Sequence, residues 1–126
     1  MIINHPATLA EVEMAFERYE HALLSNDNAT LATFFLDDPT TTRYGVGEHQ
    51  HGYAEIMAFR AGQKPFARSL EHTVITAYGP DFAVASTLFH NPALPNEIGR
   101  QTQVWVRSDG GWKVAAAHVS MIQRPA

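Results

Sequence analysis

The feature that most constrains the fold is a series of four long β-rich segments in the second half of the chain. They are residues 68–79, 81–91, 97–108 and 111–122. Gly79 and Pro80 mark the first turn, a loop with two prolines follows the second segment, and "SDGG" marks a tight hairpin before the last. Because such short connections join neighbouring strands, we expect an antiparallel meander.

The first half of the chain has a helical periodicity instead. Thr8 followed by Glu11 is typical of a capping box. Apolar residues then recur at spacings of three and four: Leu9, Val12, Phe16, Tyr19 and Leu23. This pattern predicts a helix of about five turns that ends near the turn-prone stretch "SNDN".

Two more helices and a short strand are predicted before the meander. A second helix should run over residues 28–36, the β-branched stretch 40–45 should form a strand, and a third helix should cover 53–62. Helices that precede a meander indicate an α+β fold, with the helices packed on one face of a curved, mainly antiparallel sheet. We expect a single domain over residues 1–126, with a cone-shaped pocket between helix and sheet.

Composition excludes several classes of function. Nine Lys and Arg residues against 13 Asp and Glu give a net charge of −4, the wrong sign for a nucleic-acid surface. The absence of cysteine excludes disulfides and thiolate metal ligands. Neither a leader pattern nor a stretch of ~20 apolar residues is present. We therefore expect a cytoplasmic protein with no membrane or nucleic-acid partner.

Arginine dominates the basic residues, since only Lys64 and Lys113 are lysines. Arginine suits bidentate recognition of carboxylates better than lysine does. Arg43 ends the predicted short strand, and Arg60 lies one helical turn after Ile56 on the third predicted helix. Because arginines are seldom buried unless paired, an inward position implies either a glutamate partner or an anionic ligand. The sequence leaves both alternatives open.

Tyrosine and histidine side chains offer further candidates. Tyr19 lies in the apolar stripe of the first helix, where its hydroxyl either meets a substrate or bonds to backbone. His118 on the last strand is either a general base or a neutral core histidine. His49 and His51 lack a third ligand at metal-binding spacing, so we expect loop histidines and no metal. No phosphate loop, dinucleotide fingerprint or nucleophile elbow occurs, and we expect no cofactor.

The neighbours of His118 depend on the register of the last hairpin. If "DG" forms a two-residue turn, Gln101 and Gln103 share a face with His118. If the glycine after it makes a bulge, Arg100 and Thr102 do so instead. A slip of one residue therefore changes the predicted site.

Several stretches together resemble a known family. They are "TRYGVGEHQHG", "IMAFRAGQ", "ITAYGPDFAVASTLF" and "GRQTQVWVRSDGGWKVAAAHVS". They are similar to the AtzH-like family, formerly a domain of unknown function, which includes the oxalurate-catabolism protein HpxZ. The resemblance spans nearly the whole chain and implies a cystatin-like fold of the nuclear transport factor 2 type, also called SnoaL-like.

The resemblance also implies an activity and a site. Members are implied to act on small carboxylated ureas or ureido acids in nitrogen catabolism, as a decarboxylase or an amidohydrolase. Tyr19 and Arg43 are then the implied catalytic pair, and Arg60, Arg100 and His118 fall at motif positions that would line the same pocket. A guanidinium fork that binds the substrate carboxylate would orient it toward the tyrosine without a metal.

Two alternatives follow from the same resemblance. Gln63 stands where relatives usually carry an arginine, which favours a less charged substrate. The alternative function is ligand binding without catalysis, because this fold supports binding without chemistry. The protein would then be a small-ligand-binding module or an accessory subunit of an amidase in the same pathway. Folds of this type usually dimerise through the exposed sheet face, so we expect a homodimer with Trp105 or Trp112 at its surface.

Overall fold

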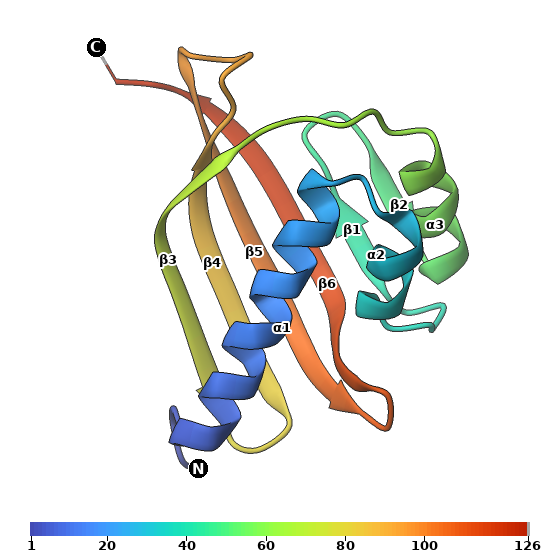
Figure 1. The fold of residues 1–126 in the computed structure, drawn as a ribbon, viewed down its shortest axis with the longest axis vertical. Helices are drawn as coiled ribbons and strands as arrows, with labels where there is room; N and C mark the ends of the chain where they lie inside the picture. The colour runs from blue at the N-terminus through green and yellow to red at the C-terminus, as the bar shows by residue number, and fades with distance from the viewer. Residues whose placement is uncertain (126) are drawn as a thin grey trace.

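The computed structural model describes residues 1–125, which form three helices and one six-stranded sheet (Figure 1). The helices are α1 (Pro6–Leu24), α2 (Asn28–Phe34) and α3 (Tyr53–Ala61). The strands are β1 (Thr42–Tyr44), β2 (His49–His51), β3 (Ser69–Tyr78), β4 (Phe82–His90), β5 (Glu97–Ser108) and β6 (Gly111–Gln123). The predicted α+β fold and its four-stranded meander are confirmed. None of the three helices has the length and apolarity needed to cross a membrane.

Helix α1 begins earlier than the sequence pattern indicates. Pro6 occupies its first turn, where a residue without a backbone N–H loses no hydrogen bond. Thr8 is therefore already inside the helix, and its Oγ1 lies 3.4 Å from Nδ1 of His5. The predicted capping box of Thr8 and Glu11 is wrong, because the N-cap is His5, three residues upstream of Thr8, and Pro6 follows it as the first helical residue.

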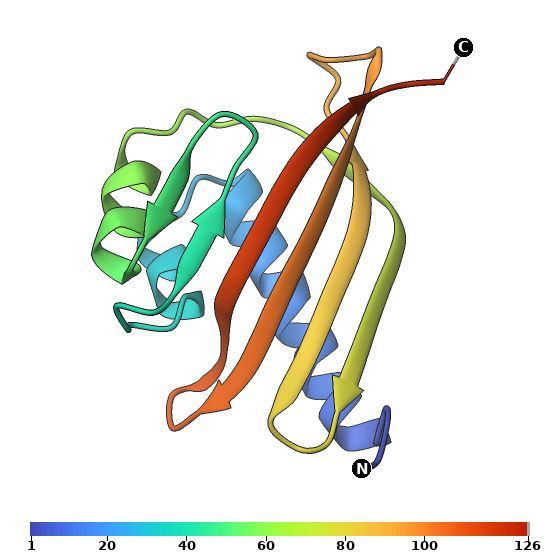
Figure 2. The ribbon, with the colours of Figure 1, turned by 180° about the vertical axis from the view of Figure 1, so that it is seen from behind.

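The sheet has the strand order β2-β1-β6-β5-β4-β3. Strand β1 runs parallel to β6, whereas all other neighbours are antiparallel. The predicted loop histidines His49 and His51 instead lie on the edge strand β2, which pairs with β1. Seen from behind, the sheet presents its outer face, with α1 on the far side (Figure 2). Strands β1 and β2 thus extend the meander on the side of α3.

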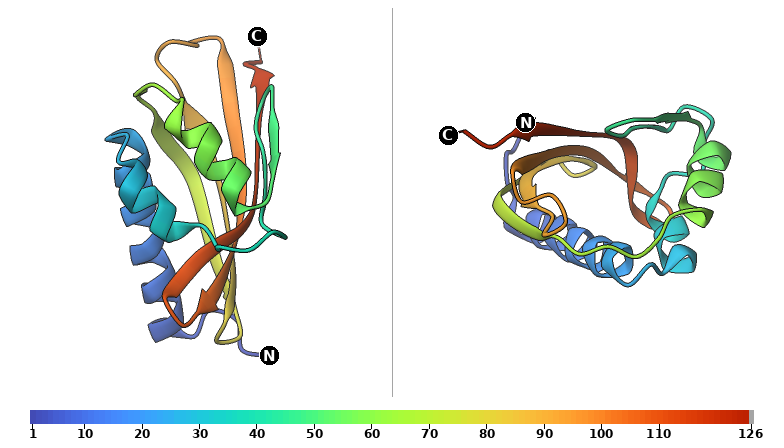
Figure 3. Two further views of the ribbon diagram at one scale, coloured as in Figure 1. Left: turned by 90° about the vertical axis from the view of Figure 1, so that its right-hand side faces the viewer. Right: turned by 90° about the horizontal axis from the view of Figure 1, so that it is seen from above.

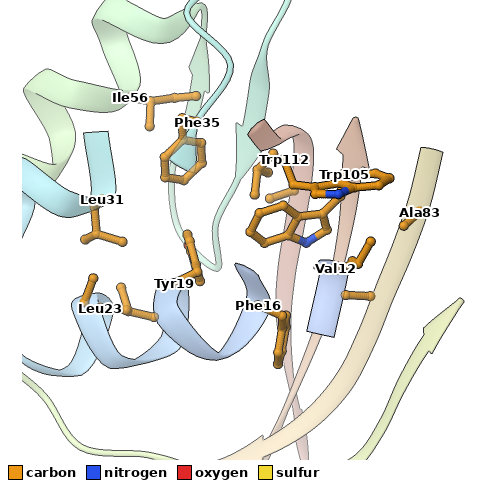
Figure 4. Close-up of a cluster of buried hydrophobic side chains, with 14 residues drawn as sticks. Val12, Phe16, Tyr19, Leu23, Leu31, Phe35, Ile56, Ala83, Trp105 and Trp112 are labelled. Carbon is orange, nitrogen blue, oxygen red and sulfur yellow. The ribbon is translucent and has the colours of Figure 1, made fainter. Parts of the chain in front are cut away.

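The hydrophobic core lies between α1 and the concave face of the sheet, which curves around the helix when seen from above (Figure 3). Tyr19 packs edge-on against Phe35 and Trp105, at centroid distances of 5.8 and 5.9 Å (Figure 4). Trp105 is 0% exposed and Trp112 is 7% exposed. Both tryptophans point inward into this core, so the expectation that one of them supplies an exposed dimer surface is wrong.

A bulge in β6 decides which of its later side chains face inward. The hairpin closes with Asp109–Gly110 as a two-residue turn, yet Ala115 is left unpaired and the register shifts by one residue. Beyond the bulge Thr102 pairs with His118, which puts both on the outer face. Gln103, one position along β5, therefore faces the core.

Candidate functional site

A small cavity lies between α1, α3 and the inner face of the sheet. Its volume is about 120 Å³, and its lining combines Tyr19 with three arginines, three glutamines and apolar side chains. Pockets for drug-sized ligands span roughly 300–1,000 Å³. This cavity therefore suits a molecule of only a few heavy atoms.

Two of the three arginines already have carboxylate partners. Arg43 on β1 donates to Oε1 of Glu48 at 2.5 Å and to the Gln50 side-chain oxygen at 3.1 Å. Arg68, just before β3, forms a two-pronged pair with Glu20 on α1, at 2.8 Å from Nε and 2.6 Å from Nη2. Both positive charges are locally balanced, which keeps these guanidinium groups charged at low cost.

Arg60 on α3 is the exception. It is 5% exposed, makes no salt bridge with any residue in 1–125, and its Nε has no hydrogen-bond partner there. Its guanidinium lies 5.7 Å from the centre of the Phe59 ring. Burial lowers the pKa of Arg60, and the nearby charge of Arg43 lowers it further. Helix geometry explains the inward position, since the core residue Ile56 lies one turn earlier on the same face.

Two glutamines of β5 add donors to the same cavity. Gln101 is 5% exposed and Gln103 is 1% exposed. The Nε2 atom of each is buried without a hydrogen-bond partner in residues 1–125. Buried polar atoms are nearly always satisfied, so a cluster of unpaired donors on one cavity indicates a place for a ligand with acceptor atoms.

Tyr19 completes the cavity from the side of α1. It is 4% exposed and packs against aromatic edges of the core. Burial raises the pKa of Tyr19, while the charges of Arg68, Arg43 and Arg60 act in the opposite direction. Its side chain therefore remains a neutral phenol at neutral pH, and its hydroxyl is able to donate a proton or a hydrogen bond.

The structure brings together three of the five predicted site residues. Tyr19, Arg43 and Arg60 line the cavity, as the sequence patterns and the resemblance imply. Arg100 and His118 do not, because both point to the outer face of the sheet, where they are exposed. The prediction that they line the same pocket is wrong, because the bulge at Ala115 turns His118 outward on β6, whereas Arg100 lies out of phase with the buried Trp105 on β5.

The predicted histidines gather on that outer face instead. His49, His51 and His118 lie around the Tyr44 ring, at centroid distances of 6.1, 5.6 and 5.9 Å. They line a shallow depression of about 450 Å³ that is open to solvent. Among residues 1–125, no three histidine, aspartate, glutamate or cysteine side chains are placed to hold a metal ion. The enclosed cavity, with its unpaired buried donors, is therefore the stronger candidate site.

Four polar cavity residues are absent from the predicted site: Gln63, Arg68, Gln101 and Gln103. Gln101 and Gln103 face inward because β5 alternates without a break from the buried Trp105, and the sequence alone does not show which way Trp105 points. Arg68 follows "KPFA", which carries no periodic signal. The arginine-rich composition was the only sequence signal for Arg68, and it does not discriminate among seven arginines.

The fold and the cavity define a class of protein: a cystatin-like, nuclear transport factor 2-like cone that encloses a small polar pocket at the end of its core. A family model matches residues 1–125, and the chain belongs to the AtzH-like family. The resemblance found in the sequence is thereby confirmed. No curated protein matches the chain.

Two solved structures are similar over almost the full chain. A cystatin-like fold protein from Burkholderia xenovorans LB400 is 44% identical, covers 99% of both chains and has a TM-score of 0.95. A protein of unknown function from the DUF3225 family of Pectobacterium atrosepticum SCRI1043 is 47% identical, covers 96% of this chain and 95% of its own, and has a TM-score of 0.92. A nuclear transport factor 2-like superfamily protein from Salmonella enterica serovar Typhimurium LT2 shares the fold. It is 23% identical, covers 95% of this chain and 93% of its own, and has a TM-score of 0.72.

Proposed function

We propose that this protein is a cofactor-free enzyme that decarboxylates or hydrolyses a small carboxylated urea or ureido acid. The observation that carries the proposal is the buried guanidinium of Arg60, which has no protein carboxylate and faces the same cavity as Tyr19. A buried cation without a partner is costly, and a bound carboxylate would remove that cost. The family and the cavity volume support a small substrate.

Arg60 takes the anchoring role that the resemblance gives to Arg43. The charge of Arg43 is already engaged by Glu48, whereas Arg60 forms no salt bridge with a carboxylate within residues 1–125. Two charge-assisted hydrogen bonds from Arg60 would fix one carboxylate of the substrate. The rest of the molecule would then lie against Tyr19 and the two glutamines of β5.

Decarboxylation is the chemistry that this lining supports best. Cleavage of the bond between the carboxylate carbon and the urea nitrogen releases CO2 and leaves the electron pair on nitrogen. That nitrogen takes the phenol proton of Tyr19, and the phenolate then regains a proton from water. Hydrolysis needs a base to activate water, and neither a carboxylate nor an imidazole is among the described side chains that line the cavity.

The lack of a base among the described lining residues favours binding without turnover as the second candidate function. Tyr19 is the only proton donor of moderate acidity among the lining residues, so the cavity holds one half of an acid–base pair. A ligand-binding module or an accessory subunit of an amidase needs no more than that. It would bind the same acids saturably and leave them unchanged unless a partner enzyme were added.

Carbon-13 NMR of the protein with oxalurate, and separately with freshly prepared carboxylated ureas, tests the proposal. We expect product signals above a no-protein blank, lost in Arg60→Met and reduced in Tyr19→Phe. Arg18→Met, which removes an exposed arginine from α1, is the matched control and should keep full turnover. Equal signals in blank and protein samples for every compound would refute the enzymatic function and leave the binding role.

A further inference from the structure

Hydrogen bonds to their oxygens fix the two cavity glutamines of β5 in one orientation. Oε1 of Gln103 accepts from the indole Nε1–H of Trp105 at 3.1 Å, and Oε1 of Gln101 accepts from Nη1 of Arg68 at 3.1 Å. Indole and guanidinium nitrogens only donate, so a flipped amide would set donor against donor. The amide NH2 groups, and not the oxygens, are therefore left for the ligand.

The charges around the cavity add up to one unpaired cation. The Arg43–Glu48 and Arg68–Glu20 pairs each cancel, at 2.5 and 2.6 Å. Arg60 remains without a carboxylate among residues 1–125. A ligand with one negative charge would neutralise the site. A second negative charge on the ligand would lose its hydration without an unpaired cation in the cavity to pair with.

From the locked amides and the single free guanidinium, we propose that the pocket selects a monoanion with one carboxylate and adjacent carbonyl oxygens, and that it rejects dianions of the same shape. Arg60 binds the carboxylate, and the Nε2 groups of Gln101 and Gln103 donate to the carbonyl oxygens. Trp105 and Arg68 are positioning residues that hold the amides in this orientation. The inference rests on the proposed function and narrows its substrate to carboxylated ureas with a single carboxylate, which contain the carboxylate–nitrogen bond that the decarboxylation breaks.

Isothermal titration of the intact protein at neutral pH with oxamate, oxalate and oxamide tests the charge rule. These probes have almost the same size and shape and carry one, two and no negative charges. We expect oxamate to bind at least tenfold more tightly than either of the others. Oxalate that binds as tightly as oxamate, or no binding of oxamate, would overturn the inference.

Glu48→Gln gives the sharper test, because it frees the charge of Arg43 without changing the shape of the side chain. With a second unpaired cation, the preference should shift toward oxalate by at least tenfold. Glu17→Gln removes the same charge from an exposed position on α1 and should leave the preference unchanged. An equal shift in both variants would show that overall charge, and not pairing in the pocket, sets the selectivity.

Gln103→Glu tests the donor assignment. The new carboxylate still accepts from Trp105 but presents an acceptor to the ligand, so oxamate binding should fall at least tenfold while the circular dichroism spectrum is kept. Gln103→Leu, which removes the donor without adding charge, should also weaken oxamate. Unchanged oxamate affinity in both variants would refute the role of Gln103.

The two proposals fail in different ways. If ureido acids are turned over but oxamate shows no preference over oxalate, the proposed function stands and the monoanion rule is wrong. If oxamate binds selectively but no compound is turned over, the monoanion rule stands for a binding protein and catalysis is wrong. Absence of both turnover and binding refutes both.

Discussion

Replacement of Arg60 by methionine should stabilise the protein while it abolishes ligand binding. The guanidinium is 5% exposed and lacks a carboxylate within residues 1–125, so the folded state bears the cost of its desolvation. Methionine has a similar reach, is apolar and adapts to irregular space. Replacing a buried ion pair by apolar groups of similar volume is often neutral or stabilises a protein by about 1–4 kcal/mol, and the desolvation cost behind that gain also applies to Arg60. Because Arg60 also faces the cavity, we expect a gain of about 1–2 kcal/mol, at the lower end of that range.

The expected gain corresponds to a measurable shift in melting temperature. An unfolding entropy of about 2.1 cal/mol/K per residue gives about 0.26 kcal/mol/K for the 126 residues of the chain. A gain of about 1–2 kcal/mol then raises Tm by about 4–8 °C. Urea unfolding followed by circular dichroism measures the same quantity, provided that the m-value stays constant.

The assay is repeated with oxamate to separate stability from binding. At a concentration 100 times its Kd, a ligand stabilises the native protein by about 2.7 kcal/mol, and Arg60→Met should lose this increment. Arg18→Met, at an exposed position, should change stability by less than about 0.5 kcal/mol. A loss of more than about 1 kcal/mol in Arg60→Met, at unchanged m-value, would refute the claim that this guanidinium is unsatisfied.

Four further predictions rest on other parts of the structure. Tyr19→Phe should lower turnover by about 10²–10⁴-fold and leave oxamate binding within a few fold, which NMR and titration measure. Gly99→Ala should lower stability by about 1–3 kcal/mol in urea unfolding, because its Cβ would overlap the ring of Phe89, which lines the cavity. Asp27 caps α2 through Thr30, and these hydrogen bonds lower its pKa. The stabilisation from the ionised Asp27 side chain is therefore fully present above the ordinary aspartate pKa and is lost as pH falls through the lowered pKa. The difference in free energy of unfolding between wild type and Asp27→Asn should shrink as pH falls between these two pKa values. We also propose a homodimer, and light scattering at micromolar concentration should give twice the 14.0 kDa chain mass, a monomeric mass being the contrary result.

Periodicity predicted the fold because its signals are local. The apolar stripe of α1 and the alternation along β3 to β6 each follow from contacts repeated within one element. The start of α1 was missed because Pro6 can open a helix without a side-chain cap. Strand β2 was missed because three residues at a sheet edge owe their conformation to the partner strand and not to their own propensity.

The site was only half predictable because its geometry depends on pairings between elements. Nothing local indicates that Ala115 bulges, yet that one residue turns His118 from the inner to the outer face of the sheet. Likewise, the sequence contains several glutamates able to pair with an arginine. Only the packing of α1 against the residues before β3 pairs Glu20 with Arg68, which leaves Arg60 as the unpaired cation among the described residues that line the cavity.

Core and site share one strand, which couples ligand recognition to packing. Every second residue of β5 faces inward, which includes Gln101, Gln103 and Trp105. Trp105 fills the core and also holds the side-chain amide of Gln103, which faces the cavity. Trp105 is fully buried between Tyr19 and the sheet, and its indole N–H has one acceptor, the oxygen of Gln103. A substitution that displaces Trp105 therefore releases the amide as well as opening the core. Because Gln103 is held by the buried Trp105 and Gln101 by Arg68, which is itself paired with Glu20, the orientation of the donors is set before the ligand arrives, and binding need not order them.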